Sequence, residues 1–335
     1  MSGLMRRGTH RRRRGMTLIE IMISLVLLGI VGGTIMRVIM RQQRFYQGVN
    51  QIMTQRGELR NATSVLPVEL RSLSSIGADI LVASDSSIEF MQNVGTSIVC
   101  EVVNNAQVAL PPEKLSTGQV LTSFYGYGDP QRGYSVYIYN DSSVLGNEDD
   151  RWQKFTLTDV HTDNTRCPGG MPGGFTKVFD LGQRRPVLEL SSTDPTDPVT
   201  LGPLSQYIGV GAPVRIMRKV KYKLYQASDS KWYLGFAPYD YTSGAYAELS
   251  PVSGPYDAYS TSSGTPSGFG FRYFTVDDAE VAAGSDSVTR LTIARVDLVA
   301  RARTSSKVRT AGIQGGASQQ YKDSLAVAVM LRNRQ

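Results

Sequence analysis

The sequence contains very few residues of the types that most often carry out catalysis or bind metals. It has two cysteines, Cys100 and Cys167, and two histidines, His10 and His161, in 335 residues. Neither cysteine belongs to a CxxC pair and the histidines lack ligand spacing, so no zinc site and no cysteine–histidine nucleophile is predicted. GxSxG, Walker, HExxH and strand-associated GxGxxG motifs are absent. We therefore expect no enzyme, no cofactor and no metal site, and we interpret His161 as a surface or packing residue.

Acidic residues are missing from the first 15 positions, where six of the chain's arginines lie. The whole chain carries 36 Lys and Arg against 29 Asp and Glu, a formal charge of +7. Without those six arginines the counts are 30 and 29, so the excess charge belongs to the leader. This distribution is weak evidence for nucleic-acid binding, and we expect no nucleic-acid partner. The six are Arg6, Arg7, Arg11, Arg12, Arg13 and Arg14.

Charged residues are also almost absent from residues 16–36, where Glu20 is the only one before Arg37. A helix of this length is roughly 30 Å long, which matches the hydrocarbon core of a membrane. The arginines ahead of it favour a cytoplasmic N-terminus, so the chain after Arg37 is predicted to be exported. A secretory signal cleaved near residues 31–33 and an uncleaved anchor would each explain the apolar run.

Neither of these alternatives explains Glu20, because a carboxylate costs about 2.5–3.5 kcal/mol at the centre of a bilayer. Cleavage after Gly15 would make Met16 the N-terminus and place its positive amine about 6 Å from Glu20 along the helix axis. The amine of the same chain or of a neighbouring chain could then pair with the carboxylate. The sequence therefore favours processing at Gly15.

The segment GMTLIE, which starts at Gly15, resembles the type III signal of type IV pilins and type II secretion pseudopilins. The resemblance implies that a prepilin peptidase cleaves after Gly15 and methylates Met16, where these families usually carry phenylalanine. It also implies that Glu20 acts in filament assembly. Gly29 and Gly33 form a GxxxG pair that would allow close helix packing, with chance spacing in a glycine-tolerant membrane helix as an equal alternative.

The C-terminal sequence narrows the resemblance. YKDSLAVAVMLRNR, residues 321–334, is similar to the end of W-class minor pilins, which has the form L-x-x-x-V-x-L-R-N-R. The J-type pseudopilins of type II secretion share the N-terminal signal, but their chains are typically shorter. The matching residues are Leu325, Val329, Leu331, Arg332, Asn333 and Arg334.

Hydrophobic periodicity predicts one long helix from residue 16 to about residue 66, the second half of it amphipathic. Pro67 is expected to kink or end it, before one or two further turns. Strands are predicted after it. Their ranges are 88–91, 97–103, 134–140, 215–225, 232–236, 288–300 and 325–331.

Three expectations concern details of these strands. Residues 215–225 and 232–236 should form a hairpin, with Lys219, Lys221 and Lys223 on the solvated outer face of an edge strand. The change of apolar parity near Ala294 suggests a β-bulge. Residues 242–268 are rich in Ser, Gly, Pro and Tyr, which is typical of a long surface loop.

Export would place Cys100 and Cys167 in an oxidising compartment, which favours a disulfide between them. The alternative is one buried and one exposed thiol, because Cys100 lies in an apolar strand. The acidic segment 140–150 could form a calcium loop of the kind some pseudopilins have, but its spacing does not match a DxDxDG loop. An exposed acidic turn is the favoured interpretation.

These observations predict an α+β, pilin-like fold in which a long N-terminal helix packs on an antiparallel sheet with long loops. The expected parts are a cleaved leader (1–15), a helix (16–76, membrane-spanning at about 16–36) and a β-rich periplasmic or extracellular domain (77–335). The resemblance implies a minor pilin that primes pilus assembly or joins the tip or shaft, with a J-type pseudopilin as the alternative. Its implied partners are the prepilin peptidase, other minor pilins, the major pilin, the inner-membrane assembly platform and inner-membrane lipid. It would reside in the inner membrane and then in the filament.

Overall fold

A computed structural model describes most of the chain after residue 15. The described residues are 16–75, 77–125, 128–140, 151–167, 176–180, 183–192, 204, 208–262, 266–304, 307 and 320–331, without the side chains of residues 62 and 178. Gly15, nearly all of the acidic segment 140–150 and residues 332–334 of the C-terminal motif lie outside this set. The chain divides into two compact units, Met1–Thr54 with Thr304–Tyr321, and Gln55–Arg303 with Lys322–Gln335.

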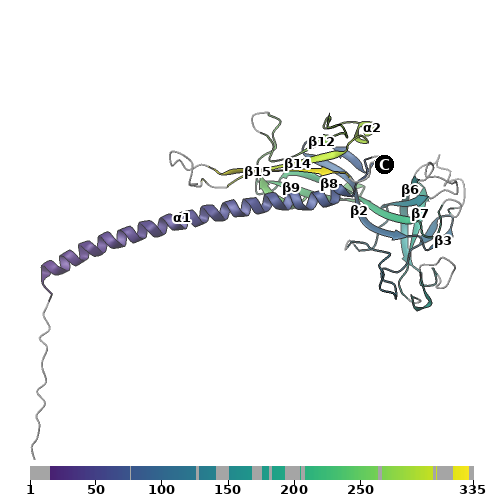
Figure 1. Ribbon diagram of the computed structural model, residues 1–335, viewed down its shortest axis with the longest axis horizontal. Coiled ribbons are helices and arrows are strands. Elements are labelled where there is room, and N and C mark those ends of the chain that lie inside the picture. Colours follow the sequence, from purple (N-terminus) through teal and green to yellow (C-terminus); the bar gives the residue numbers. More distant parts are fainter. Residues whose placement is uncertain are drawn as a thin grey trace, which may run out of the picture. The chain divides into compact units, whose positions relative to one another are not determined.

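Helix α1, Leu18–Arg71, is one continuous element of 54 residues that enters both units (Figure 1). The alternative that Pro67 ends the helix is wrong, because Pro67 lies inside α1, and the helix continues to Arg71 as the further turn predicted after Pro67. A proline removes one hydrogen bond from the helix. Leu66 and Leu70 are fully buried on either side of it, so packing holds the last turn in helical form despite that loss.

Eleven strands of the described residues form one antiparallel sheet. Its main path runs in the order β1-β2-β8-β5-β6-β7-β4-β3, and β9, with β10 and β11, branches from β8. The strands are β1 (Ile80–Ala83), β2 (Ser87–Ile98), β3 (Glu101–Asn104), β4 (Gln107–Ala109), β5 (Ser135–Asn140), β6 (Arg151–Thr162), β7 (Pro186–Ser192), β8 (Pro213–Gln226), β9 (Trp232–Asp240), β10 (Ala245–Tyr246) and β11 (Ser250–Tyr256). A 3₁₀ turn, η1 (Val178–Asp180), precedes β7.

The β8–β9 hairpin is confirmed, but β8 is not an edge strand. It pairs with β2, β5 and β9. Side chains of neighbouring strands therefore lie beside the lysines on the same face of the sheet. Lys221 forms an ion pair with Glu89 of β2 at 2.7 Å, and its ammonium lies 4.5 Å from the centre of the Tyr246 ring of β10. Local alternation correctly separated the two faces of β8, but it carries no information on how many strands flank it.

Two further predictions, one of a loop and one of two separate strands, are also corrected. Residues 242–268 contain β10 and β11, both paired with β9. Residues 88–91 and the start of 97–103 belong to one strand, β2. The chain leaves β2 at Val99, where the Cys100 amide donates to the carbonyl of Ala109, and restarts as β3. The strand break therefore reflects a change of pairing partner from β8 to β4.

A second, four-stranded antiparallel sheet has the order β13-β12-β14-β15, with β12 at Phe269–Phe274, β13 at Glu280–Val281, β14 at Arg295–Arg303 and β15 at Lys322–Met330. The predicted strand 288–300 with a bulge is wrong at its start, because Ser287–Arg290 form a short helix, α2. Asp286 caps α2 by accepting a hydrogen bond from the amide of Thr289 at 2.8 Å. This helical turn, and not a bulge, accounts for the change of parity. The alternating last strand is confirmed as β15.

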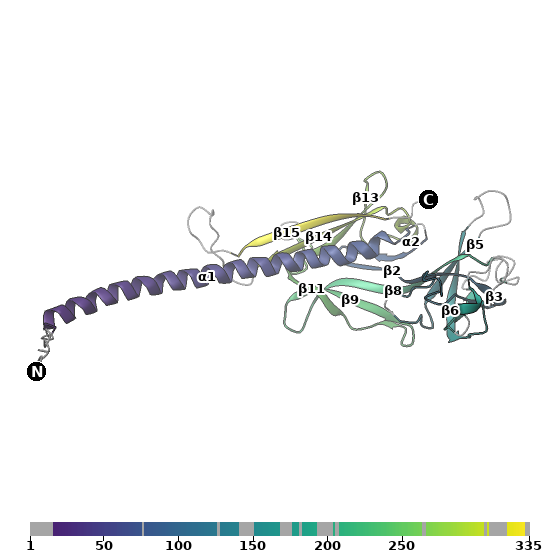
Figure 2. The same cartoon turned by 60° about the horizontal axis from the view of Figure 1, so that its bottom comes forward.

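The C-terminal part of α1 contributes to the main core of its unit together with both sheets (Figure 2). Leu59, Leu66 and Leu70 of the helix join a buried cluster with Val220 of β8 and Leu298 of β14. A second buried cluster lies among β4, β5, β6 and β7, with further residues from β2 and the start of β8. The result is an α+β architecture, a long N-terminal apolar helix followed by an antiparallel β domain, which fits the expected pilin-like arrangement.

Candidate functional site

The start of α1 places Glu20 in the first helical turn. The Glu20 amide donates to the carbonyl of Thr17 at 3.1 Å, and the hydroxyl of Ser24 donates to the carbonyl of Glu20 at 2.7 Å. A carboxylate in the first turn interacts favourably with the positive end of the helix dipole. Both Met16 and Glu20 are exposed, so the carboxylate is open to a partner from outside the chain.

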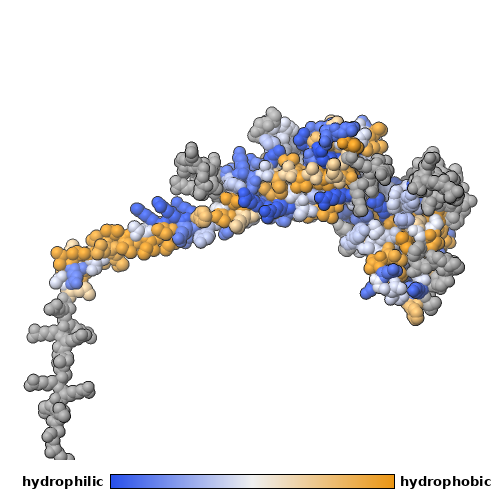
Figure 3. Space-filling view, viewed as in Figure 1, coloured by the Kyte–Doolittle hydropathy of each residue, from blue (hydrophilic) through white to orange (hydrophobic). Residues whose placement is uncertain are grey.

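The helix surface around Glu20 is apolar and uncovered. Within the described residues α1 alone is long and apolar enough to cross a membrane. Figure 3 shows hydrophobic residues gathered along its N-terminal part. Because the described part of the chain leaves these side chains exposed, their burial needs a lipid layer or other helices. They include Leu18, Ile19, Met22, Leu25, Val26, Leu28, Ile30, Val31, Ile35 and Met36.

The glycines of this segment leave its surface flat. A Cβ atom built at Gly29, Gly32 or Gly33 would have no heavy atom within 4 Å, so no contact within the described part of the chain requires glycine at these positions. The nearby hydroxyl of Thr34 donates to the carbonyls of Ile30 and Val31 at 3.0 and 2.8 Å. Its polar group is thus satisfied inside the helix, which suits an apolar surrounding. Helix–helix contact at Gly29 and Gly33 stays a prediction.

Further along, a partly buried polar network connects α1 to strands β2 and β8. Glu69 accepts hydrogen bonds from the side-chain amide of Gln92 at 2.7 Å and from the hydroxyl of Tyr222 at 3.0 Å. The Arg218 guanidinium donates a hydrogen bond to the side-chain oxygen Oε1 of Gln92 at 2.8 Å. Burial raises the pKa of Glu69, and these hydrogen bonds offset part of that effect. The helix end is therefore fixed by polar contacts as well as by its leucines.

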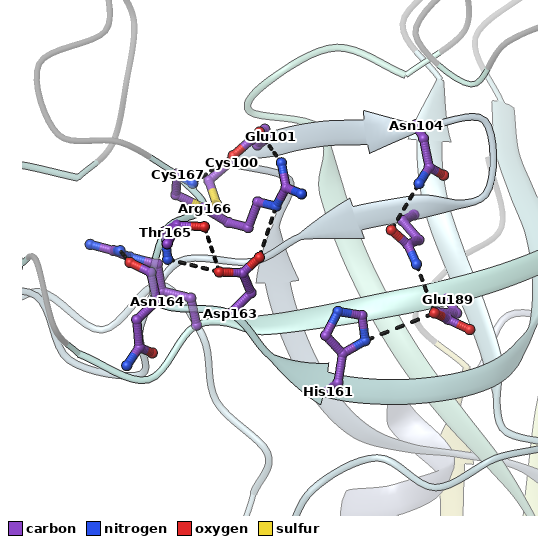
Figure 4. Close-up of polar contacts among 12 residues, drawn as sticks. Cys100, Glu101, Asn104, His161, Asp163, Asn164, Thr165, Arg166, Cys167 and Glu189 are labelled. Atoms are coloured by element: carbon purple, nitrogen blue, oxygen red, sulfur yellow. Dashed lines mark hydrogen bonds and ion pairs between the residues drawn. A yellow bond between two sulfur atoms is a disulfide. The ribbon is translucent and has the colours of Figure 1, made fainter.

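Cys100 and Cys167 form a disulfide whose Cα atoms are 5.5 Å apart (Figure 4). The sequence favoured this pairing. The Glu101 carboxylate accepts hydrogen bonds from the backbone amide of Cys167 at 2.7 Å and from the Arg166 guanidinium at 3.4 Å. Arg166 also donates a hydrogen bond to the Asp163 carboxylate at 3.1 Å. Hydrogen bonds from Thr165 are the main cause that lowers the pKa of Asp163. These contacts tie the segment after β6 to the start of β3.

The structure also assembles one group of metal-capable side chains that the sequence analysis missed. Asp159, His161 and Glu189 have ligand atoms that all lie within 4.8 Å of one another. Asp159 and His161 lie on β6 and Glu189 lies on the paired strand β7. His161 and Glu189 are 28 residues apart in the sequence. The alternation of Asp159 and His161 on one strand face was the only available signal, and it does not identify a third ligand on another strand.

Comparison with known proteins bears on the N-terminal segment. Residues 10–36 match the family model described as the prokaryotic N-terminal methylation motif. No curated protein and no solved structure matches the chain. The motif supports a type IV pilin-like or pseudopilin-like protein. The matched range contains Gly15, Met16, Glu20, Gly29 and Gly33, and the helix that begins there is consistent with membrane anchoring.

Proposed function

We propose that this protein is a minor pilin, a structural subunit that takes part in priming a type IV pilus or is incorporated at its tip or shaft. The observation that carries the proposal is the methylation motif at residues 10–36, set at the start of an exposed apolar helix. The same helix continues into a disulfide-linked antiparallel β domain. The C-terminal similarity to W-class minor pilins favours this class over others, through Leu325, Val329 and Leu331.

Maturation would consist of cleavage after Gly15 and methylation of Met16 by a prepilin peptidase. The mature subunit would wait in the inner membrane with its β domain in the periplasm, and then enter the filament at the cell surface. Its partners would be other minor pilins, the major pilin and the inner-membrane assembly platform. No catalytic role is assigned, and neither nucleic acid nor a cofactor is needed for this function.

Within this proposal Glu20 directs docking. When helices pack, the amine of Met16 loses water, and an unpaired charge in a poorly solvated place is unfavourable. Glu20 is exposed in the single chain, so it can pair with the amine of its own chain or of a neighbour. A subunit that satisfies this pair would be favoured at the growing base of the filament.

The alternative is a J-type pseudopilin at the tip of a type II secretion pseudopilus. The methylation motif supports both classes equally. Deleting the gene separates them, since loss of surface pili with intact protein secretion supports the minor pilin. Loss of secretion with intact pili supports the pseudopilin.

The processing step is tested by mass spectrometry of the protein isolated from membranes of its own host. We expect Met16 at the N-terminus with one added methyl group. A Gly15→Leu variant should keep the leader, because the bulky side chain blocks the cleavage position, and it serves as the matched control. A mature protein that starts near residues 31–34 would instead indicate ordinary secretion and would contradict the proposal.

A further inference from the structure

The three side chains Asp159, His161 and Glu189 share one face of the β6–β7 ladder. Asp159 and His161 are two residues apart on β6, so they point to the same side of the sheet. Glu189 of β7 is the register partner of Asp159. All three retain access to solvent. Strand pairing thus brings two carboxylates and one imidazole together without any loop rearrangement.

The carboxylates of Asp159 and Glu189 lie opposite each other on paired strands. Like charges directly opposite one another on an antiparallel pair are destabilising. Among the described residues no hydrogen bond or ion pair is made by the Asp159 carboxylate. The Nδ1 atom of the His161 imidazole lies 3.9 Å from Oε1 of Glu189. A cation between the two carboxylates would remove the repulsion.

Glu189 is held in a defined orientation by a short chain of amides (Figure 4). The Nε2 atom of Gln107 donates to Oε1 of Glu189 at 2.7 Å, and Asn104 donates to Gln107 at 2.8 Å. Partners that orient a ligand in this way are typical of metal sites and often change metal affinity by roughly 10–100-fold when removed. The second carboxylate oxygen of Glu189 remains available.

We propose that Asp159, His161 and Glu189 form a binding site for a divalent transition-metal ion that accepts mixed nitrogen and oxygen ligands, such as Zn²⁺. Bonds of about 2.0–2.2 Å from one ion to two ligand atoms require those atoms to lie within about 4.4 Å of each other. Ligand atoms within 4.8 Å reach that geometry through small rotations of exposed side chains. Solvent would supply the fourth ligand.

The imidazole decides which metals fit the site. Calcium and magnesium prefer all-oxygen sets with six or more ligands, whereas imidazole suits zinc, copper and nickel. The ion would link the side chains of β6 to a side chain of β7 and so cross-link the two strands. It would therefore stabilise the folded β domain in addition to the Cys100–Cys167 disulfide.

The test uses the full-length protein in detergent, purified with a tag that contains no histidine and carrying His10→Gln, which removes the chain's other histidine. Titration calorimetry with Zn²⁺ should give one ion per chain. Electron paramagnetic resonance of bound Cu²⁺ should show a single coordinated imidazole nitrogen. His161→Gln in this background should weaken Zn²⁺ binding by at least about tenfold and remove the nitrogen signal.

The carboxylates are tested by comparing the Tm of each variant with that of the parent, first with a chelator and then with Zn²⁺. With a chelator present, Asp159→Asn and Glu189→Gln should leave Tm unchanged or raise it, because each relieves the repulsion. With Zn²⁺ present, Tm should rise in the parent protein and in the control Glu248→Gln, an exposed carboxylate outside the site, but not in these two variants. A side chain that matters only for packing would shift Tm equally in both conditions.

Several results would overturn the site. They are no Zn²⁺ bound by the His10→Gln protein, or unchanged affinity in the variants at positions 159, 161 and 189. Binding of Ca²⁺ that is stronger than that of Zn²⁺ and insensitive to His161→Gln would indicate a carboxylate-only site and would also overturn it. None of these measurements depends on filament assembly.

Discussion

Asp79 is a buried acid that should make the β domain more stable in mild acid than at neutral pH. Its side chain is 3% exposed, in the segment that joins α1 to β1. Oδ2 of Asp79 accepts a hydrogen bond from the amide of Ser74 at 2.8 Å, and its carbonyl accepts one from the amide of Met91 at 2.8 Å. The residue therefore fixes the exit of the helix against β2.

Burial raises the pKa of Asp79 from 3.8 to about 6, although the Ser74 amide and the charges of Arg215 and Lys154 oppose this. Since the pKa is higher in the folded state than in the unfolded one, protonation stabilises the fold. That contribution is complete below about pH 3.8 and is lost as the pH rises through about 6. A shift of about two units corresponds to about 3 kcal/mol, of which about 2 kcal/mol is lost between pH 4 and pH 7.

Asp79→Asn tests this reasoning because the amide oxygen can still accept from Ser74, while the buried charge is gone. The free energy of unfolding, measured by urea titration with tryptophan fluorescence, should be compared between variant and parent at pH 4 and at pH 7. We expect the variant to gain about 2 kcal/mol relative to the parent from pH 4 to pH 7.

Two controls isolate the cause. Asp277→Asn removes one negative charge at an exposed position and should leave the comparison between the two pH values unchanged. Asp79→Ala also removes the acceptor for Ser74 and should destabilise the protein at both pH values by about 1–3 kcal/mol more than Asp79→Asn does. A variant-to-parent difference that is the same at pH 4 and pH 7 would refute a buried, proton-binding Asp79.

Three further predictions address assembly, cross-linking and packing. Glu20→Leu should be cleaved and methylated nearly normally but depleted from sheared filaments, since an unpaired amine can cost about 3–5 kcal/mol when fully buried; wild-type stoichiometry in filaments would contradict this. Replacing Cys100 and Cys167 together by Ser should lower the free energy of unfolding by about 4 kcal/mol for a loop of 67 residues, and equal denaturation midpoints would disprove it. Tyr137→Phe should stabilise by about 1 kcal/mol, because no hydrogen-bond partner of the buried hydroxyl lies among the described residues; a clear loss in a urea titration would count against it.

Much of the fold follows from local patterns in the sequence. The apolar run and its amphipathic continuation predicted α1 to within about one turn of its C-terminal end. Strict alternation predicted β8 and β15, and the short polar turn between β8 and β9 predicted their hairpin. In each case the side-chain period is set by one element alone, so no knowledge of its neighbours was needed.

Predictions failed where the neighbours decide the structure. The lysine row of β8 looked like a solvated edge, but β2, which is distant in the sequence, pairs with β8 along these lysines on the side opposite β9. Residues 242–268 have the composition of a loop, yet pairing with β9 turns part of them into strands. Asp286 caps α2 just before β14, and this local signal was overlooked in favour of a longer strand. Tertiary pairing overrides composition in such segments.

The candidate functional residues divide in the same way. Gly15, Met16 and Glu20 lie within one short segment, so the sequence alone was sufficient to single them out, and that segment lies inside the matched range 10–36. The group of Asp159, His161 and Glu189 exists only because β6 and β7 pair in the register that places Asp159 opposite Glu189, after a register shift between Leu157 and Asp159. A shift of one residue would turn Glu189 to the opposite face, so no spacing rule could have found it.

The two compact units draw their stability from different sources, and this keeps the experiments separable. Between residues 16 and 40 the large apolar side chains are exposed, so the free energy of burying them depends on lipid or on other helices. The unit that begins at Gln55 has its own buried clusters and its own disulfide. Glu20 lies in the first unit, whereas Asp79 lies in the second. Distant sites without shared partners act additively, so a loss of filament incorporation in Glu20→Leu with an unchanged urea midpoint would locate the defect in assembly and not in folding.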